Sequence, residues 1–176
     1  MRKGFTLIEI LIAIMIMIVL VTIAVPMYER AVEKSRVTDA RTTLKRIYDA
    51  KRQVMDAMQM QDASIPDVYS STRFGFENLG FSLDCPQGTT VQNNHIVSCA
   101  TQDFVFFMQP LDQAQSNAVC AVRRTGDYAR VNFIYRGEET NDVTVKFQCQ
   151  DGGVADGCEV YGMPSAVNNA FCVLPQ

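Results

Sequence analysis

The chain has 176 residues and a formal net charge of -3 at pH 7, so it has room for one globular domain with its own core and little more. The acidic balance argues against a general nucleic-acid-binding protein, which usually carries a basic patch that attracts phosphates. We therefore expect one head with one appendage, and no specific nucleic-acid partner.

The first element along the chain is an apolar segment from Phe5 to Val25. Its length is close to the roughly 20 residues that a helix needs to cross a bilayer. The many Leu, Ile, Val and Phe residues outweigh the roughly 3 kcal/mol that one acidic residue, here Glu9, costs on insertion. Arg2 and Lys3 precede the segment, so the N-terminus should stay in the cytoplasm and the chain after Val25 should be translocated.

Glu9 is unusual because a carboxylate in hydrocarbon usually marks a functional position with a positive partner. Cleavage between Gly4 and Phe5 would create such a partner, since the new amino group lies at the i to i+4 spacing from Glu9. The pair could close within one chain or between neighbouring chains. The alternative is that Glu9 extends to the membrane interface and has no role in assembly.

The string KGFTLIE, from Lys3 to Glu9, followed by a long apolar helix, resembles the class III signal of type IV pilins and pseudopilins. The resemblance implies that a membrane-embedded prepilin peptidase cuts after Gly4 and removes residues 1–4 as a leader. It also implies that the new terminal Phe5 is N-methylated. Glu9 would then neutralise the terminus of an adjacent subunit during assembly.

A competing interpretation is an ordinary secretory signal. Thr22 and Ala24 would then be the small residues ahead of a cut before Val25. The apolar stretch is long for such a signal, and Glu9 interrupts it. We therefore favour a transmembrane and filament-core helix over residues 5–25, followed by an extracytoplasmic head over residues 26–176.

The head should begin with a helix. Pro26 lacks an amide hydrogen, so a helix through it should bend or lose hydrogen bonds; in the resembled family, a proline here lies where the helix loosens in filaments. Charged residues from Glu29 to Lys34 include like charges four apart and should pair with neighbouring groups. Apolar residues then recur with helical periodicity to about residue 62, ahead of Pro66: Val37, Ala40, Leu44, Ile47, Val54 and Met58.

A sheet should follow a long loop. The region from Pro66 to Thr101 is rich in Gly, Ser, Asn and Thr, which predicts the loop. Four runs rich in Val, Phe and Tyr predict strands at residues 103–109, 118–124, 129–135 and 143–150. Short connections favour an antiparallel meander, with the amphipathic helix covering one face. The predicted class is α+β, with a pilin-like, four-stranded antiparallel sheet and disulfide-stapled loops.

All six cysteines lie beyond the apolar segment: Cys85, Cys99, Cys120, Cys149, Cys158 and Cys172. Their even number and the lack of a CxxC pair favour three disulfides in an oxidising compartment over a zinc site. Proximity along the chain suggests pairing Cys85 with Cys99, Cys158 with Cys172, and Cys120 with Cys149, among fifteen possible arrangements.

The sequence contains few candidates for a metal-binding or catalytic site. The glycine-rich stretch from Asp151 to Gln176 predicts a disulfide-pinned surface loop, whose Asp151, Asp156 and Glu159 are calcium candidates although their spacing matches no strong motif. The single histidine, His95, should lie in an exposed polar loop. No nucleotide loop, HExxH or GxSxG motif occurs, so we expect neither a cofactor nor an enzyme.

The resemblance implies a structural subunit that polymerises with itself and other pilins. It would sit in the inner membrane as a single-pass protein, meet an assembly platform there, and end in a pilus at the cell surface. Three disulfides favour an exposed pilus over a short periplasmic pseudopilus. The alternatives are a type II secretion pseudopilin, a DNA-uptake subunit, and a membrane-anchored binding or adhesin module that never polymerises.

Overall fold

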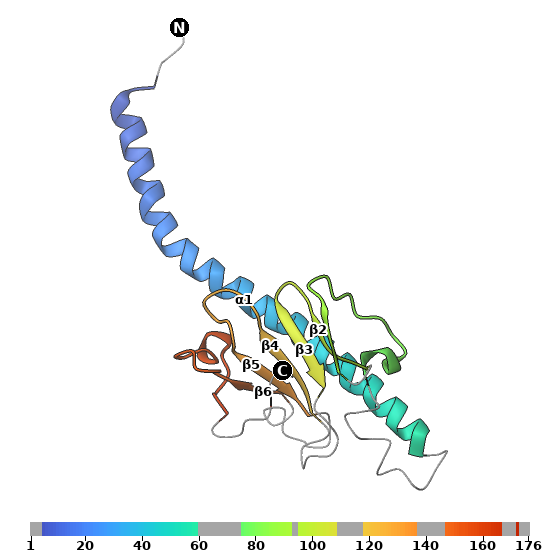
Figure 1. The fold of residues 1–176 in the computed structure, drawn as a ribbon. Coiled ribbons are helices and arrows are strands. Elements are labelled where there is room, and N and C mark those ends of the chain that lie inside the picture. Colours follow the sequence, from blue (N-terminus) through green and yellow to red (C-terminus); the bar gives the residue numbers. More distant parts are fainter. Residues whose placement is uncertain are drawn as a thin grey trace.

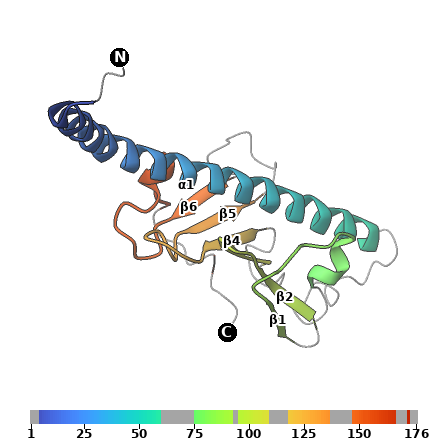
Figure 2. The same ribbon diagram turned by 90° about the horizontal axis from the view of Figure 1, so that it is seen from above.

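The computed structural model describes residues 5–59, 75–92, 95–108, 118–136, 147–166 and 172. One long helix, α1 (Leu7–Gln59), packs on an antiparallel sheet. Two short 3-10 helices, η2 (Phe76–Leu79) and η3 (Glu159–Tyr161), contact α1. The N-terminal half of α1 projects away from the head, and its C-terminal half runs across one face of the sheet (Figures 1 and 2). The α+β class with a helix covering one face is therefore confirmed.

The sheet has six strands in sequential order, each antiparallel to its neighbour. They are β1 (Thr89–Gln92), β2 (His95–Ala100), β3 (Phe104–Met108), β4 (Val119–Arg123), β5 (Asn132–Tyr135) and β6 (Phe147–Gln150). The predicted meander is confirmed in β3 to β6, but the predicted number of four strands was wrong. Residues 143–146, which the last predicted strand included, lie outside the described residues.

The hairpin of β1 and β2 occupies the region that we predicted to be a loop. Its strands are rich in Thr and Ser, and β1 forms an edge of the sheet where Thr89 and Val91 are exposed. Polar side chains are typical of edge strands, which must resist pairing with other chains. The pairing also shifts register between Thr90 and Val91, so the alternation that identifies a strand is broken there.

The main core lies between α1 and the sheet. The helical stripe predicted from periodicity is buried at Val37, Ala40, Leu44 and Ile47, and half-buried at Val54; the side chain of Met58 and residues 60–74 lie outside the described part. Tyr48 and Lys51 also lie on this side and are buried. Burial lowers the pKa of Lys51 to about 8.

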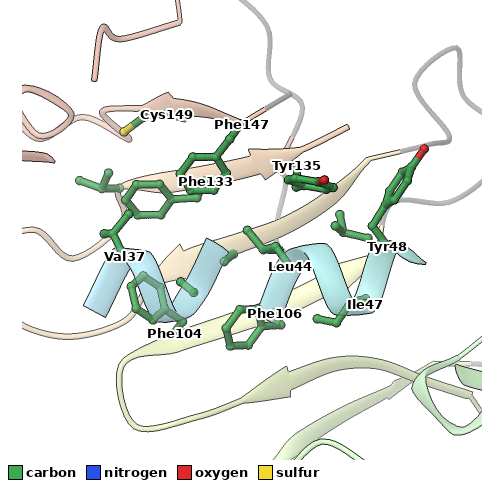
Figure 3. Close-up of a cluster of buried hydrophobic side chains, with 14 of the residues drawn as sticks. Val37, Leu44, Ile47, Tyr48, Phe104, Phe106, Phe133, Tyr135, Phe147 and Cys149 are labelled. Atoms are coloured by element: carbon green, nitrogen blue, oxygen red, sulfur yellow. The ribbon is translucent and has the colours of Figure 1, made fainter. Parts of the chain in front are cut away.

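Aromatic rings on the sheet face the helical stripe (Figure 3). The Phe133 ring is stacked on Phe147 at a centroid distance of 5.8 Å and meets Phe104 edge-on at 6.0 Å. Tyr48 of α1 meets Tyr135 of β5 edge-on at 5.4 Å. Such offset and edge contacts are the favourable arrangements for aromatic pairs, and they hold these rings together in the core between the helix and the sheet.

A second cluster lies on the opposite face of the sheet, at Phe107, Cys120, Val122, Ile134 and Cys172 among others. Side chains alternate between the two faces of a strand, and so Phe107 points away from α1 while its neighbours in β3 point toward it. Strand β4, in the middle of the sheet, is buried at every position.

The three disulfides are Cys85–Cys99, Cys120–Cys172 and Cys149–Cys158. The first was predicted correctly, whereas the predicted pairs of Cys158 with Cys172 and of Cys120 with Cys149 were wrong. The physical reason is the sheet. Cys120 faces the second cluster, while Cys149 faces the main core with Cys158, and β5 separates their two strands.

The segment after β6 is more than the surface loop that we predicted. Cys158 and Tyr161 are buried in the main core. Ser165 forms a parallel bridge with Cys149, and the Ala166 amide donates a hydrogen bond to the Cys149 carbonyl at 2.8 Å. The turn at Gly152 requires glycine, because its φ is +60° and an added Cβ would lie 1.8 Å from the Arg130 carbonyl oxygen.

Candidate functional site: the projecting half of α1 and its junction with the head

The projecting half of α1 is an apolar rod that the head does not cover. Every residue from Phe5 to Ala31 is exposed, and the large apolar side chains among them expose between 46% and 83% of their surface. From Phe5 to Met27, where Glu9 is the one charged residue, the helix is apolar all round and needs a membrane or other apolar helices as its surroundings. By length and composition, this helix is able to cross a membrane.

Glu9 lies in the first turn of α1 and contacts the residue that caps the helix. Its Oε2 accepts hydrogen bonds from the amide nitrogen and the hydroxyl of Thr6, each at 2.8 Å, and its own amide donates to Thr6 Oγ1 at 3.4 Å. This reciprocal arrangement is a capping box, which satisfies amide donors that a helix start leaves free. The sequence signal was present as Thr-x-x-Glu, but our prediction considered only the charge of Glu9.

The other predicted residues of this segment are Gly4, Phe5 and Pro26. Gly4 lies outside the described residues, and Phe5 is exposed just ahead of α1. Pro26 lies inside the continuous helix, where it leaves the Thr22 carbonyl without its usual amide donor. Figure 1 shows α1 curving gradually along its length, as long helices commonly do.

The helix meets the head at a buried ion pair. Glu33 is the first buried side chain along α1, and Arg123, at the end of β4, is 2% exposed. The Arg123 Nη2 lies 2.9 Å from Glu33 Oε1, and its Nε donates to Glu33 Oε2 at 3.2 Å. Two parallel hydrogen bonds of this kind fix orientation as well as distance.

Other groups complete this junction. Arg123 Nη1 donates to the Asp103 carboxylate at 2.9 Å and to the Asp103 carbonyl at 2.8 Å. Arg36 lies 2.5 Å from Glu33 Oε1 and 3.4 Å from the Asp103 carboxylate. The Tyr161 hydroxyl donates to Glu33 Oε2 at 3.3 Å. The junction therefore joins α1, the β2–β3 turn, β4 and η3.

The charges of the junction reinforce one another. Burial disfavours the ionised Glu33 carboxylate, but hydrogen bonds and charge attraction from Arg123 and Arg36 outweigh it and hold the pKa of Glu33 below its usual value. Burial, followed by the nearby Glu33 charge, raises the pKa of Tyr161. The phenol therefore keeps its proton and remains a hydrogen-bond donor to Glu33.

We expected the charged segment 29–34 to pair with neighbouring groups but did not identify Arg123. The only signal for it was a cation ending an otherwise apolar strand.

The calcium candidates do not converge in the structure. Asp151 Oδ1 accepts a hydrogen bond from the Cys158 amide at 2.6 Å, whereas Asp156 and Glu159 are exposed. Within the described ranges, no group of three or more His, Cys, Asp or Glu side chains is placed to hold a metal ion. Asp151 therefore serves to close its own turn.

The expectation of an exposed loop histidine was wrong. His95 begins β2 and is half-buried, with its Nδ1 at 2.5 Å from Glu77 Oε1. The other oxygen of Glu77 accepts the Ile96 amide at 3.0 Å. Burial disfavours the ionised form of Glu77, but these hydrogen bonds and others from its own backbone hold its pKa below the usual value. The pair ties η2 to the outer hairpin.

The comparisons with known proteins identify the N-terminal segment. Residues 1–25 match the family model of the prokaryotic N-terminal methylation motif. This motif is the class III signal of type IV pilins and pseudopilins, which are structural subunits and not enzymes. No curated protein and no solved structure is significantly similar to the chain. The motif and the apolar helix fit a membrane-anchored, pilin-like or pseudopilin-like protein.

Proposed function

We propose that this chain, which begins with the class III signal, is a structural subunit that polymerises into a type IV pilus-like filament. The observation that carries the proposal is the long apolar rod, exposed from Phe5 to Ala31, at the end of a folded head. Prepilin peptidase would remove residues 1–4, and Phe5 would be N-methylated, as the motif implies.

The physical reason for polymerisation is the missing partner of the rod. In the membrane, lipid tails surround it, and in a filament the rods of other copies replace the lipid. Lipid tails are as apolar as the side chains of the rod, so burial alone gives no reason to leave the membrane. Close helix packing and specific polar contacts have to stabilise the assembled state.

Glu9 is the polar contact that we propose for assembly. Both hydrogen bonds from Thr6 end on Oε2, and within the described part of the chain no hydrogen bond reaches Oε1. One oxygen therefore holds the helix start, while the other is available to a terminal amino group. In hydrocarbon, such an ion pair would favour one axial register between copies over the alternatives.

The head would lie outside the cytoplasm, because the cations that precede the span favour that orientation. Three disulfides support an oxidising location and favour a surface-exposed pilus. The class III signal is shared with type II secretion pseudopilins, so loss of surface filaments with secretion intact, on deleting the gene, would support the pilus.

The decisive measurement is mass spectrometry of the N-terminal peptide, from native membranes and from sheared surface material. We expect a terminus at Phe5, one methylene heavier than the unmodified residue. A Gly4→Val variant should keep its leader and be absent from the sheared surface material. The reason is that the peptidase site must admit an extended chain without a side chain at this position. A terminus at Val25 or Met1 would instead indicate a secreted or merely anchored domain.

A further inference from the structure

A groove of about 550 Å³ lies beside α1 on the head. One wall is the face of α1 from Lys34 to Arg41, and the other is the segment from Tyr161 to Ala166, with Phe147 and Gln148 of β6 between them. Figure 3 shows Val37 in the α1 wall and Phe147 of β6, which lies between the two walls. The groove has no place in the junction described above, apart from sharing Tyr161.

The groove is apolar at its base and positive at its edges. Val37, Phe147 and Tyr161 are buried, whereas Lys34 and Arg41 are exposed and lie two helical turns apart, about 10 Å along the axis. The Arg41 guanidinium sits over the Phe147 ring, 5.2 Å from its centroid. None of the described residues that line the groove is acidic.

The two cations are not neutralised by their own chain as far as the structure describes it. Neither Lys34 nor Arg41 has a salt bridge to any described carboxylate. An apolar floor between two cations that no described carboxylate neutralises favours an acidic group that also carries apolar or backbone surface. An acidic protein segment has this chemistry.

The charge of the chain indicates where such a segment comes from. Residues 32–59, the part of α1 beyond the rod, hold seven cations and four carboxylates, whereas the described residues after α1 hold four cations and seven carboxylates. The helix side of one head therefore attracts the remaining surface of another. Asp156 and Glu159, which we call the acidic turn, are exposed and have no salt bridge to any described cation.

We propose that the groove of one copy receives the acidic turn of a second copy. The proposal rests on the proposed function, since it assigns a contact between heads in the filament. Groove and turn are different patches of the molecule, so the contact is heterologous. Repeated from copy to copy, such a contact extends an open array and does not close at a dimer.

The first test is a charge exchange in the full-length protein, with filament yield read from sheared surface material. Lys34→Glu changes the groove, and Glu159→Lys with Asp156→Asn changes the turn; Asn suits Asp156 because that residue has a φ of +54°. Each change alone should lower the yield at least about threefold, as expected for replacing an exposed attraction by repulsion. The combined variant should recover most of the yield.

Asp127→Lys is the matched control, because Asp127 is exposed in the turn between β4 and β5, outside both patches; its yield should equal that of the wild type. The contact would be overturned if Lys34→Glu gave undiminished filaments. It would also be overturned if the combined variant gave no more filaments than either single change, provided that every head is oxidised and protease-resistant.

The second test does not depend on substitutions. Wild-type filaments assembled from a mixture of isotopically light and heavy chains are treated with a carbodiimide, which joins amines to adjacent carboxylates. We expect mixed-label peptides that link Lys34 to Asp156 or Glu159. The contact would be overturned if the filaments contained mixed-label links of Lys34 to other carboxylates only, or no mixed-label link of Lys34. Either result would leave the proposed function intact. A complete lack of filaments would overturn the proposed function.

Discussion

Glu33 and Arg123 lie 90 residues apart in the sequence and face each other through two hydrogen bonds in the interior of the protein. Glu33 is also the point where α1 changes from an exposed rod to a packed helix. A buried ion pair adds little net stability, because desolvation offsets the attraction. Its effect is on specificity. An apolar stripe that repeats at each turn tolerates a slip along the sheet, whereas only one register places Glu33 beside Arg123.

Removing one partner of this pair should be costly. Glu33→Ala leaves the Arg123 guanidinium buried with Asp103 as its only described carboxylate partner, and we expect a loss of at least about 3 kcal/mol in the free energy of unfolding. The measurement is denaturant unfolding of the full-length protein in detergent. Asp39→Ala, at an exposed position of the same helix, should change stability by less than about 0.5 kcal/mol.

A double-mutant cycle with Arg123→Ala separates the pair from its surroundings. We expect the double variant to be more stable than the two single losses added together predict, because neither charge is then left alone. Additive losses would show that Glu33 and Arg123 act independently, and that the register is set by the apolar stripe alone.

The same pair should make the head sensitive to acid. The pKa of Glu33 is lower in the folded protein than its ordinary value of 4.5, so the unfolded chain takes up a proton first as the pH falls. The stabilisation is therefore complete above about pH 5 and is lost progressively below about pH 4.5. Thermal unfolding midpoints measured between pH 7 and pH 3 should fall more steeply for the wild type than for Glu33→Gln.

A second contribution to the acid response should come from Glu77, because its pKa is also lowered. Glu77→Gln removes this contribution of the His95 contact and allows it to be separated from that of Glu33. Both single variants should flatten the profile, and the double variant should flatten it most. Parallel profiles for the wild type and Glu33→Gln would assign the acid response to other carboxylates.

The sequence predicted features of the fold that depend on local periodicity. The apolar rod, the stripe around Leu44 and the strands β3 to β6 each follow from residues close together in the chain. Hairpin β1–β2 did not, because its polar edge residues resemble a loop. The disulfides depend on which face of the sheet a cysteine occupies: Cys120 is paired across the strands with Phe107 and Ile134, whereas Cys149 is opposite Phe133. That register is a tertiary property.

The site shows the same division between local and long-range information. Glu9 was identified because a charged residue inside an apolar helix stands out in the sequence, whatever the fold. Its contact with Thr6 was also local and could have been found from the Thr-x-x-Glu spacing. The contact of Glu33 with Arg123 could not, because it requires the packing of α1 on β4, which no pattern within either segment specifies.

The disulfides should contribute unequally to stability. Cys120–Cys172 closes a loop with a sequence separation of 52, against 14 for Cys85–Cys99 and 9 for Cys149–Cys158. Loop-closure entropy then predicts that double Ser variants lose about 4, 3 and 2.6 kcal/mol in that order. Denaturant unfolding of the three variants tests the order. If the Cys149–Cys158 variant were the least stable, strain and packing around Tyr161 would outweigh the entropy of the unfolded chain.

Glu9 offers the sharpest test of how the filament assembles, because its two roles respond differently to two substitutions. Glu9→Gln keeps a side chain that closes a capping box with Thr6 but removes the charge, whereas Glu9→Ala removes both. If the charge pairs with a terminal amine, both variants should abolish filaments, while disulfides and head stability stay unchanged because Glu9 does not contact the head. If only the helix start matters, Glu9→Gln should assemble normally.

The readout is the amount of protein in sheared surface filaments, compared with the amount in the membrane, for the wild type and both variants. Thr6→Ser serves as the matched control, since it retains the hydroxyl that donates to Glu9 and should assemble like the wild type. Normal filaments from Glu9→Ala would contradict any role for this carboxylate in register. Normal filaments from Glu9→Gln alone would instead assign Glu9 to its own helix, and the partner of the terminal amine would have to lie elsewhere in the assembly.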